Sequence, residues 1–153
     1  MIKIGKFIFK LQSLLNIKTQ TEESLKQELG KAVQKLEREK NKLKKLEFQK
    51  EECIENLTNK TSQGISVGKI QEYNSYISLL KEKIQLQKEN INYAQSIVDK
   101  YREQLIKVMQ EKEMLEKLKE KKYETYLAEQ AKEEQKINDE IVSYKYSKSL
   151  TDN

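Results

Sequence analysis

The fold is decided by residues 70–108, whose sequence is IQEYNSYISLLKEKIQLQKENINYAQSIVDKYREQLIKV. Apolar side chains recur along this stretch at alternating steps of three and four residues, which keeps them on one side of a helix. The positions are Ile70, Tyr73, Ile77, Leu80, Ile84, Ile91, Ala94, Val98, Tyr101, Leu105 and Val108, with polar Gln87 as the one interruption. This heptad pattern indicates a helix that pairs with another helix along a narrow seam.

A second heptad seam lies earlier in the chain. Its positions are Leu25, Leu29, Ala32, Leu36, Leu43, Leu46, Cys53 and Leu57, interrupted by Glu39 and Lys50. Between the two seams, residues 61–68 hold the only Ser/Gly cluster in the middle of the chain and predict a loop. We expect Gly64 to end the first helix in a left-handed conformation and Ser66 to cap the second. A loop this short joins antiparallel helices.

We therefore expect an all-α fold, with two long helices in an antiparallel coiled-coil hairpin that forms one domain over residues 1–153. The expected parts are a first helix at about 8–60, a tip loop at about 61–68, a second helix at about 69–142 and a frayed tail at 143–153. Pairing Leu57 with Tyr73 sets a register in which Ala32 faces Val98. The second helix then projects past the first.

Composition excludes most other classes. The chain has 153 residues, 36% of them charged and 36% apolar, with no Pro, no Trp, no His and only four Gly, which argues against all-β folds rich in turns. Without His there is no imidazole base, and a lone Cys53 excludes an intramolecular disulfide and a Cys-based zinc site. No glycine-rich phosphate loop can be built. We expect no catalytic residue, no cofactor, no metal and no enzymatic activity.

Charge and hydropathy limit the classes of partner that the chain can bind. The net charge is +5, and both signs are interspersed beyond the first twenty residues, as on a solvated helix. Only Arg38 and Arg102 are arginines, which argues against nucleic acid as a partner. No apolar stretch is long enough for an integral membrane segment. The basic start, residues 1–10, suits a membrane surface, but we favour a helix end that meets a protein partner.

Three stretches together resemble the FliJ family, the small coiled-coil components of the flagellar type III export apparatus. The stretches are Phe7-Ile-Phe9-Lys-Leu11-Gln-Ser-Leu14-Leu15, the tip with Gly64-Ile65-Ser66 and Ile70-Gln-Glu-Tyr73, and Glu134-Gln135-Lys136-Ile-Asn-Asp139-Glu140. The resemblance covers nearly the whole chain. It implies a two-helix antiparallel coiled coil similar to the γ subunit of rotary ATP synthases.

The resemblance also implies a function in bacterial flagellum biogenesis, and so in motility and chemotaxis. Proteins of this family associate with the hexameric export ATPase FliI as a stalk, promote its assembly and activity, and link it to the export gate FlhA. FliH and export chaperones are further implied partners. The implied location is cytoplasmic, peripheral at the cytoplasmic face of the inner membrane at the flagellar base.

Candidate contact residues follow from the resemblance and from the seam. For the export gate they are Leu46, Tyr76 and Leu80. For the ATPase ring they are Phe7, Phe9, Leu11, Tyr123, Tyr126, Gln135, Lys136, Asp139 and Glu140. We interpret Cys53 as a buried core residue and the lysines at 117–122 as a solvated face. Two alternatives remain open: the equivalent stalk of a virulence-type secretion system, and a plain structural coiled coil that self-associates.

Overall fold

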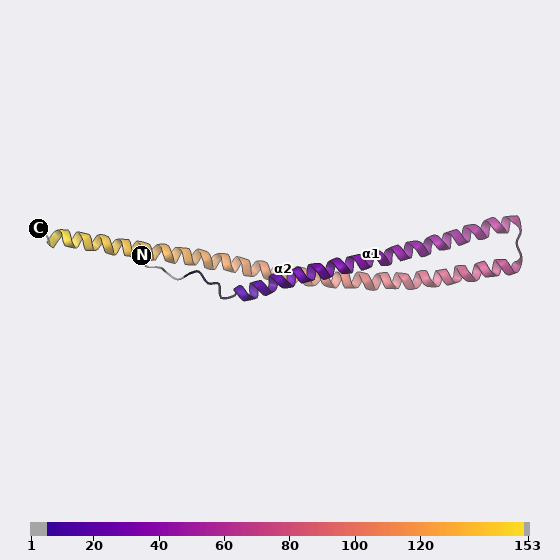
Figure 1. The fold of residues 1–153 in the computed structure, drawn as a ribbon, viewed down its shortest axis with the longest axis horizontal. Coiled ribbons are helices and arrows are strands. Elements are labelled where there is room, and N and C mark those ends of the chain that lie inside the picture. The colour runs from indigo at the N-terminus through magenta and orange to yellow at the C-terminus, as the bar shows by residue number, and fades with distance from the viewer. Residues whose placement is uncertain (1–5, 152–153) are drawn as a thin grey trace. The chain divides into compact units, whose positions relative to one another are not determined.

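A computed structural model describes residues 6–151 and contains two long helices, α1 (Gln12–Gln63) and α2 (Val67–Thr151) (Figure 1). The helices pack against each other, and the described chain has no strand. The predicted all-α fold of two long helices is therefore confirmed. Residues 1–5 and 152–153 lie outside the described part.

The helix bounds differ from those predicted at three places. α1 begins at Gln12 instead of near residue 8, because residues 6–9 are not helical. The break between the helices is limited to residues 64–66, and α2 continues to Thr151. Residues 143–151, for which a frayed tail was expected, are part of α2, and neither Pro nor Gly interrupts the helix there.

By its contacts the chain divides into two compact units. The hairpin unit is Glu22–Lys107, and the chain-end unit comprises the N-terminal part up to Thr21 and the C-terminal part from Val108. Both helices run through the boundaries without a break. The expectation of a single domain stays a prediction, and the two units are described separately below.

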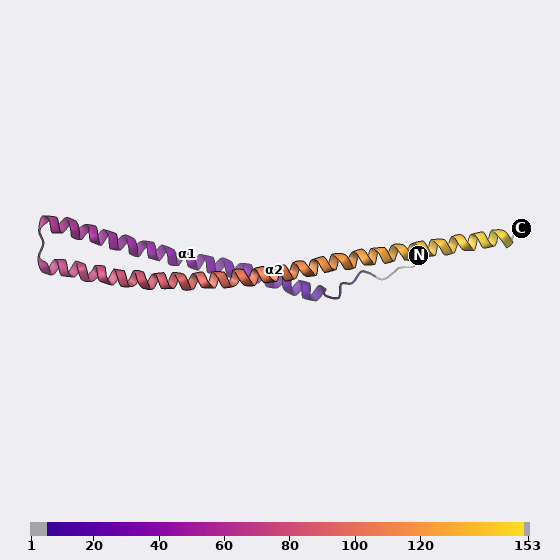
Figure 2. The same ribbon diagram turned by 180° about the vertical axis from the view of Figure 1, so that it is seen from behind.

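In the hairpin unit, α1 and α2 lie side by side from the loop onward, in both views of the ribbon (Figures 1 and 2). One core cluster is built from Ala32 and Leu36 of α1 and Ala94 and Val98 of α2, with Leu29 and Tyr101 packed against it. This agrees with the register in which Ala32 faces Val98. Small residues on both helices keep the backbones close, and Val98 is fully buried between them.

A second core cluster lies nearer the loop. Cys53, Ile77 and Leu80 form it, and Leu57 and Tyr73 pack at its edge. Cys53 is buried and carries a free thiol, as expected for a small apolar seam residue. The cluster closes the hairpin just before its turn.

The turn itself follows the predicted chemistry. Gly64 has φ of 88°, in the left-handed region where a Cβ is strained, and its N–H donates to the Thr61 carbonyl at 3.2 Å. Ser66 caps α2, because its hydroxyl accepts the Lys69 N–H at 3.3 Å and its carbonyl accepts the Ile70 N–H at 3.2 Å. Both predictions for the loop are confirmed.

One polar pair interrupts the core of the hairpin unit. The Gln87 side chain is buried and donates from Nε2 to the Glu39 carbonyl at 2.8 Å and to the Glu39 carboxylate. This bond, with smaller contributions from Lys42 and Lys35, holds the pKa of Glu39 below its ordinary value. Glu39 and Gln87, one polar interruption from each seam, therefore satisfy each other across the helices, and we expect them to help fix the register.

Candidate partner-binding surfaces

The chain-end unit contains an extended N-terminal segment, residues 6–11, which we call the strap. Its side chains alternate: Phe9 is 8% exposed and Phe7 half-buried, whereas Ile8 is 79% exposed and both Lys6 and Lys10 face solvent. A period of two is the signature of extended backbone. At Gln12 the chain turns into α1, and the Gln12 N–H donates to the Phe9 carbonyl at 3.0 Å.

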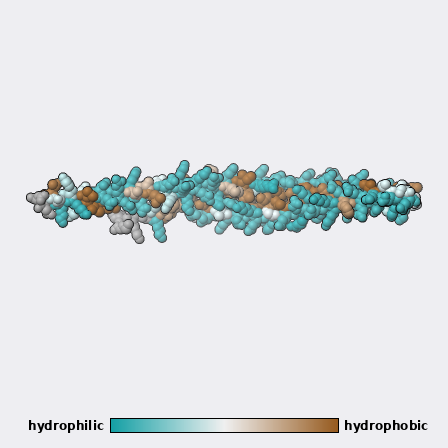
Figure 3. Space-filling view, turned by 90° about the horizontal axis from the view of Figure 1, so that it is seen from above, coloured by the Kyte–Doolittle hydropathy of each residue, from teal (hydrophilic) through white to brown (hydrophobic). Residues whose placement is uncertain are grey.

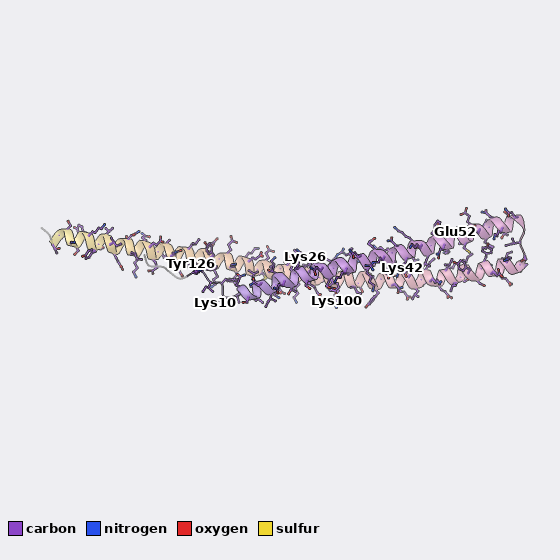
Figure 4. All side chains as sticks on the ribbon, viewed as in Figure 1. Lys10, Lys26, Lys42, Glu52, Lys100 and Tyr126 are labelled. Carbon is purple, nitrogen blue, oxygen red and sulfur yellow. The ribbon has the colours of Figure 1, made fainter. Side chains whose placement is uncertain are left out.

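Aromatic side chains hold the strap against α2. The Phe7 ring lies 5.2 Å from the Tyr123 ring in an edge-to-face arrangement and 5.6 Å from the Tyr126 ring. The two tyrosine rings stack 6.2 Å apart, and Tyr126 is labelled in Figure 4 beside the segment that enters α1. Such ring pairs contribute about 0.5–1.5 kcal/mol each beyond burial of area. Three predicted contact residues therefore meet in one cluster.

The strap also borders an open groove of about 610 Å³. Phe9, Leu11, Leu118 and Tyr126 supply its apolar wall. Its polar rim is formed by Lys6, Lys10, Lys122, Thr125 and Glu129. The groove is a concave, partly apolar surface of the kind that takes side chains of a partner.

The cover over these residues corrects the sequence analysis. The first helix was expected to begin at about residue 8 and so to include Phe9, and the second helix was expected to project past the first. Instead the strap covers α2 as far as Tyr126, and Phe9 is buried. The alternation of Lys6 to Lys10 was the available signal, because aromatic and β-branched residues in period two favour an extended segment.

A buried residue and an ion pair secure α1 behind the strap. Leu15 is buried, and the ammonium of Lys18 forms an ion pair with the Glu111 carboxylate of α2. Lys18 is a polar interruption of the first seam, so here too a polar residue finds its partner across the helices. These contacts place the start of α1 against α2 within the chain-end unit.

The remaining candidate residues for contact with the ATPase ring lie near the end of α2. Gln135, Lys136, Asp139 and Glu140 are all exposed, and they share one shallow hollow of about 430 Å³ with Lys132 and Ser143. From residue 131 to residue 151 no described residue is buried, and only Ile137 is half-buried. This part of α2 is a solvated helix with polar side chains gathered on one face.

The lysines at 117–122 are tied into the helix surface. Lys117 pairs with Glu113 at 3.2 Å, and Lys119 is half-buried beside Tyr123. Surface pairs of this type contribute little to stability. The contacts are those of a solvated helix face.

The three candidate residues for the export-gate contact differ in how far they are exposed in the hairpin unit. Tyr76 is 47% exposed, Leu46 is half-buried against the second core cluster, and Leu80 is only 1% exposed. Leu80 is therefore almost fully covered within the hairpin, and its role as a gate contact stays a prediction. Its position on the seam explains this burial.

A small groove beside Tyr76 adds a charged residue that sequence reasoning missed. Lys60 places its ammonium 5.3 Å from the centre of the Tyr73 ring, and with Lys69, Glu72 and Tyr76 it lines a hollow of about 240 Å³. A cation over an aromatic face is favourable by about 0.5–1 kcal/mol at an exposed site. The step of three from Leu57 to Lys60 continues the seam and was the signal for this contact.

The surface carries no sign of a catalytic or metal centre within residues 6–151. No group of three or more potential ligands there is suited to a metal ion. Among the same residues, no helix is both long and apolar enough to span a bilayer. Hydrophilic side chains dominate the space-filling view, with apolar patches between them (Figure 3).

Comparison with known proteins returns one result. A family model described as "Flagellar FliJ protein" matches residues 7–151, which is nearly the whole chain. No curated protein and no solved structure match.

Proposed function

Since the chain belongs to the FliJ family, whose members are components of flagellar protein export, we propose that it is a non-enzymatic stalk for the hexameric export ATPase FliI. In this role it binds the ATPase ring, promotes ring assembly and activity, and links the ring to the export gate FlhA. It works at the cytoplasmic face of the inner membrane at the flagellar base. FliH and export chaperones are its further partners.

The observation that carries the proposal is the solvated end of α2. Residues 131–151 form regular helix although no described residue of that stretch is buried. A long helix of this kind gains most of its stability from packing, so the end of α2 is suited to ordering against a partner. Its polar face, with Gln135, Lys136, Asp139 and Glu140, offers hydrogen-bonding groups to the lumen of a ring.

Truncation tests the ring contact. A deletion of residues 131–153 removes no buried residue of the described part, so the strap contacts with Tyr123 and Tyr126 stay intact. We expect the truncated protein to keep its thermal midpoint and to lose stimulation of the ATPase. Full stimulation by a folded truncated protein would contradict the proposed role of this end.

The position of the cut decides what the truncation tests. A deletion of residues 123–153 also removes both tyrosines that hold Phe7. It therefore removes the proposed ATPase contact and loosens the strap at the same time, so that a loss of stimulation could have either cause. The shorter deletion is the informative one, and the longer deletion serves as a control for a loosened strap.

For the gate we propose Tyr76 as the central contact, with Leu46 at its side. Tyr76 is half-exposed near the loop, and its loss removes little buried area. Tyr76→Ala should weaken binding to the cytoplasmic part of FlhA without changing the thermal midpoint. Phe48→Ala is the matched control, because Phe48 is an exposed aromatic residue of α1. Equal affinity of both variants would remove Tyr76 from the gate site.

The alternative of a self-associating structural coiled coil predicts the opposite result. Such a protein forms concentration-dependent oligomers and leaves the ATPase unaffected. Sedimentation of the free protein, followed by an ATPase assay, separates the two functions.

A further inference from the structure

A second line of apolar side chains runs along α2 in the hairpin unit, outside the seam. Leu79, Leu86 and Tyr93 are spaced by seven residues and are 44%, 59% and 67% exposed. Seven-residue spacing keeps side chains at one angle to the seam of a coiled coil. The three residues, which we call the outer stripe, therefore form one exposed line on α2.

The neighbours of the outer stripe show which edge of the hairpin it occupies. Each stripe residue directly precedes a buried seam residue, and Leu86 precedes Gln87, which bonds to Glu39 of α1. In an antiparallel pair, the positions that directly precede seam residues on the two helices lie along the same edge. The α1 residues of this edge are therefore those that directly precede its seam residues, as Arg38 precedes Glu39.

All five positions of α1 along that edge, from residue 31 to residue 45, are basic. They are Lys31, Lys35, Arg38, Lys42 and Lys45. Lys42 pairs with the Glu39 carboxylate at 3.4 Å. Lys42 is labelled on α1 in Figure 4. We call these five residues the basic rail.

The opposite edge of α1 has a different character. Between residues 31 and 45 it holds Val33, Glu37, Lys40 and Lys44, so both signs occur there. Lys40 pairs there with Glu37 at 3.9 Å. On α1, positive charge is thus concentrated on the edge that also carries the exposed apolar side chains of the outer stripe.

We propose that this edge docks an amphipathic α-helix of a partner protein, whose apolar stripe packs on Leu79, Leu86 and Tyr93 and whose acidic flank faces the basic rail. The outer stripe extends over about four helical turns, or about 21 Å, which suits one helix of ordinary length. The partner helix becomes the third strand of a coiled coil. The proposal goes beyond the stalk function and does not depend on it.

Other occupants fit the edge less well. A second copy of this chain would bring two basic rails together, and like charges in contact oppose association. A nucleic acid would use the rail but not two leucines, and binding of single strands relies on aromatic stacking, for which the stripe offers only Tyr93. An acidic helix uses both the charge and the apolar groups.

A labelled peptide tests the proposal with the full chain. The probe is a fluorescent helix of about 21 residues with Leu at its seam positions and Glu at the flanking positions. We expect it to bind, and Leu86→Lys with Tyr93→Lys to weaken binding about tenfold or more, a change that corresponds to about 1.4 kcal/mol. Phe48→Lys, an exposed apolar residue outside this edge, should change binding less than about twofold.

The charge arm uses matched double variants. Lys35→Glu with Arg38→Glu should weaken peptide binding about tenfold, whereas Lys40→Glu with Lys44→Glu on the opposite edge should change it far less. Circular dichroism checks that each variant keeps its helix content. All the substituted side chains are exposed, so we expect the fold to persist.

Four results would overturn the proposal. The first two are equal peptide binding by the wild type and the Leu86→Lys, Tyr93→Lys variant, and equal binding of a peptide whose flanking Glu residues are replaced by Lys. The third is displacement of the peptide by an oligo(dT) strand that binds the wild type and this double variant equally well. The fourth is a dimer of the free wild-type chain that dissociates in the double variant. Since ATPase stimulation is measured separately, failure here leaves the stalk function standing.

Discussion

Two stretches of the same helix differ in what covers them. Between Ile77 and Val98, α2 has six buried residues, including Leu80 and Val98 in the two core clusters. Between residues 131 and 151 it has none, although Ile137, Ile141 and Tyr144 keep a helical spacing. The same kind of pattern therefore predicts helix in both places, and the presence of α1 decides whether its apolar side chains are buried.

The chain-end unit adds a third arrangement. There the strap, which is not helical, covers part of α2 with Phe7 and Phe9. The aromatic side chains of this short extended segment cover apolar surface of α2. Without the strap, a longer α1 would be needed to cover the same surface. The comparison teaches that the apolar side chains of α2 available to a partner can be identified only once those covered by the strap are known.

The largest expected effect separates two leucines of α2. Leu80→Ala removes a fully buried side chain and should lower the free energy of unfolding by about 2–5 kcal/mol, because it leaves a cavity between the helices. Leu150→Ala, at a position 60% exposed, should change it by less than about 0.5 kcal/mol. Urea denaturation followed by circular dichroism measures both. Equal effects would mean that the two stretches are not different in packing.

The strap offers a test within two adjacent residues. Phe9→Ala should destabilise the chain-end unit by less than about 3 kcal/mol, below the usual cost for a core Phe, because the strap can detach instead of leaving a cavity. Ile8→Ala, on the exposed side of the strap, should have almost no effect. Proteolysis of residues 6–11 reports detachment directly. Comparable protease resistance of the Phe9→Ala variant and the wild type would contradict the packing described for the strap.

A smaller effect tests the contact between the aromatic rings of Phe7 and Tyr123, which fastens the strap to α2. In a double-mutant cycle of Phe7→Leu and Tyr123→Leu, we expect a coupling of about 0.5–1.5 kcal/mol, the usual value for an edge-to-face pair. The measurement is the free energy of unfolding of the wild type, both single variants and the double variant. Strictly additive effects would show that the two rings do not interact in solution.

The smallest effect concerns the polar pair of the hairpin unit. The folded protein holds the pKa of Glu39 below its ordinary value, chiefly through Gln87. The carboxylate therefore favours the folded state above the unfolded pKa, and this contribution is lost as the pH falls through the lowered folded pKa. Gln87→Leu should raise the pKa of Glu39 in an NMR titration, and Lys42→Leu should raise it less. The reverse order would assign the shift to charge and not to the hydrogen bond.

Much of the hairpin followed from local rules. The heptad steps around Leu80, the left-handed Gly64 and the cap at Ser66 were predicted correctly, because each depends on a few residues close together in the chain. The candidate surfaces were harder. Tyr76 is exposed near the loop, but Leu80 is buried, and its exposure depended on where the seam lies relative to the other helix.

The sequence alone determined two long helices and one tight turn between them. These follow from periodicity, from Gly64 and from composition, which are local or additive properties. Only the tertiary structure showed that the strap folds onto Tyr123 and Tyr126 and that Gln87 satisfies Glu39. Each of these brings together residues far apart in the chain, whose register is set by packing and not by any short segment.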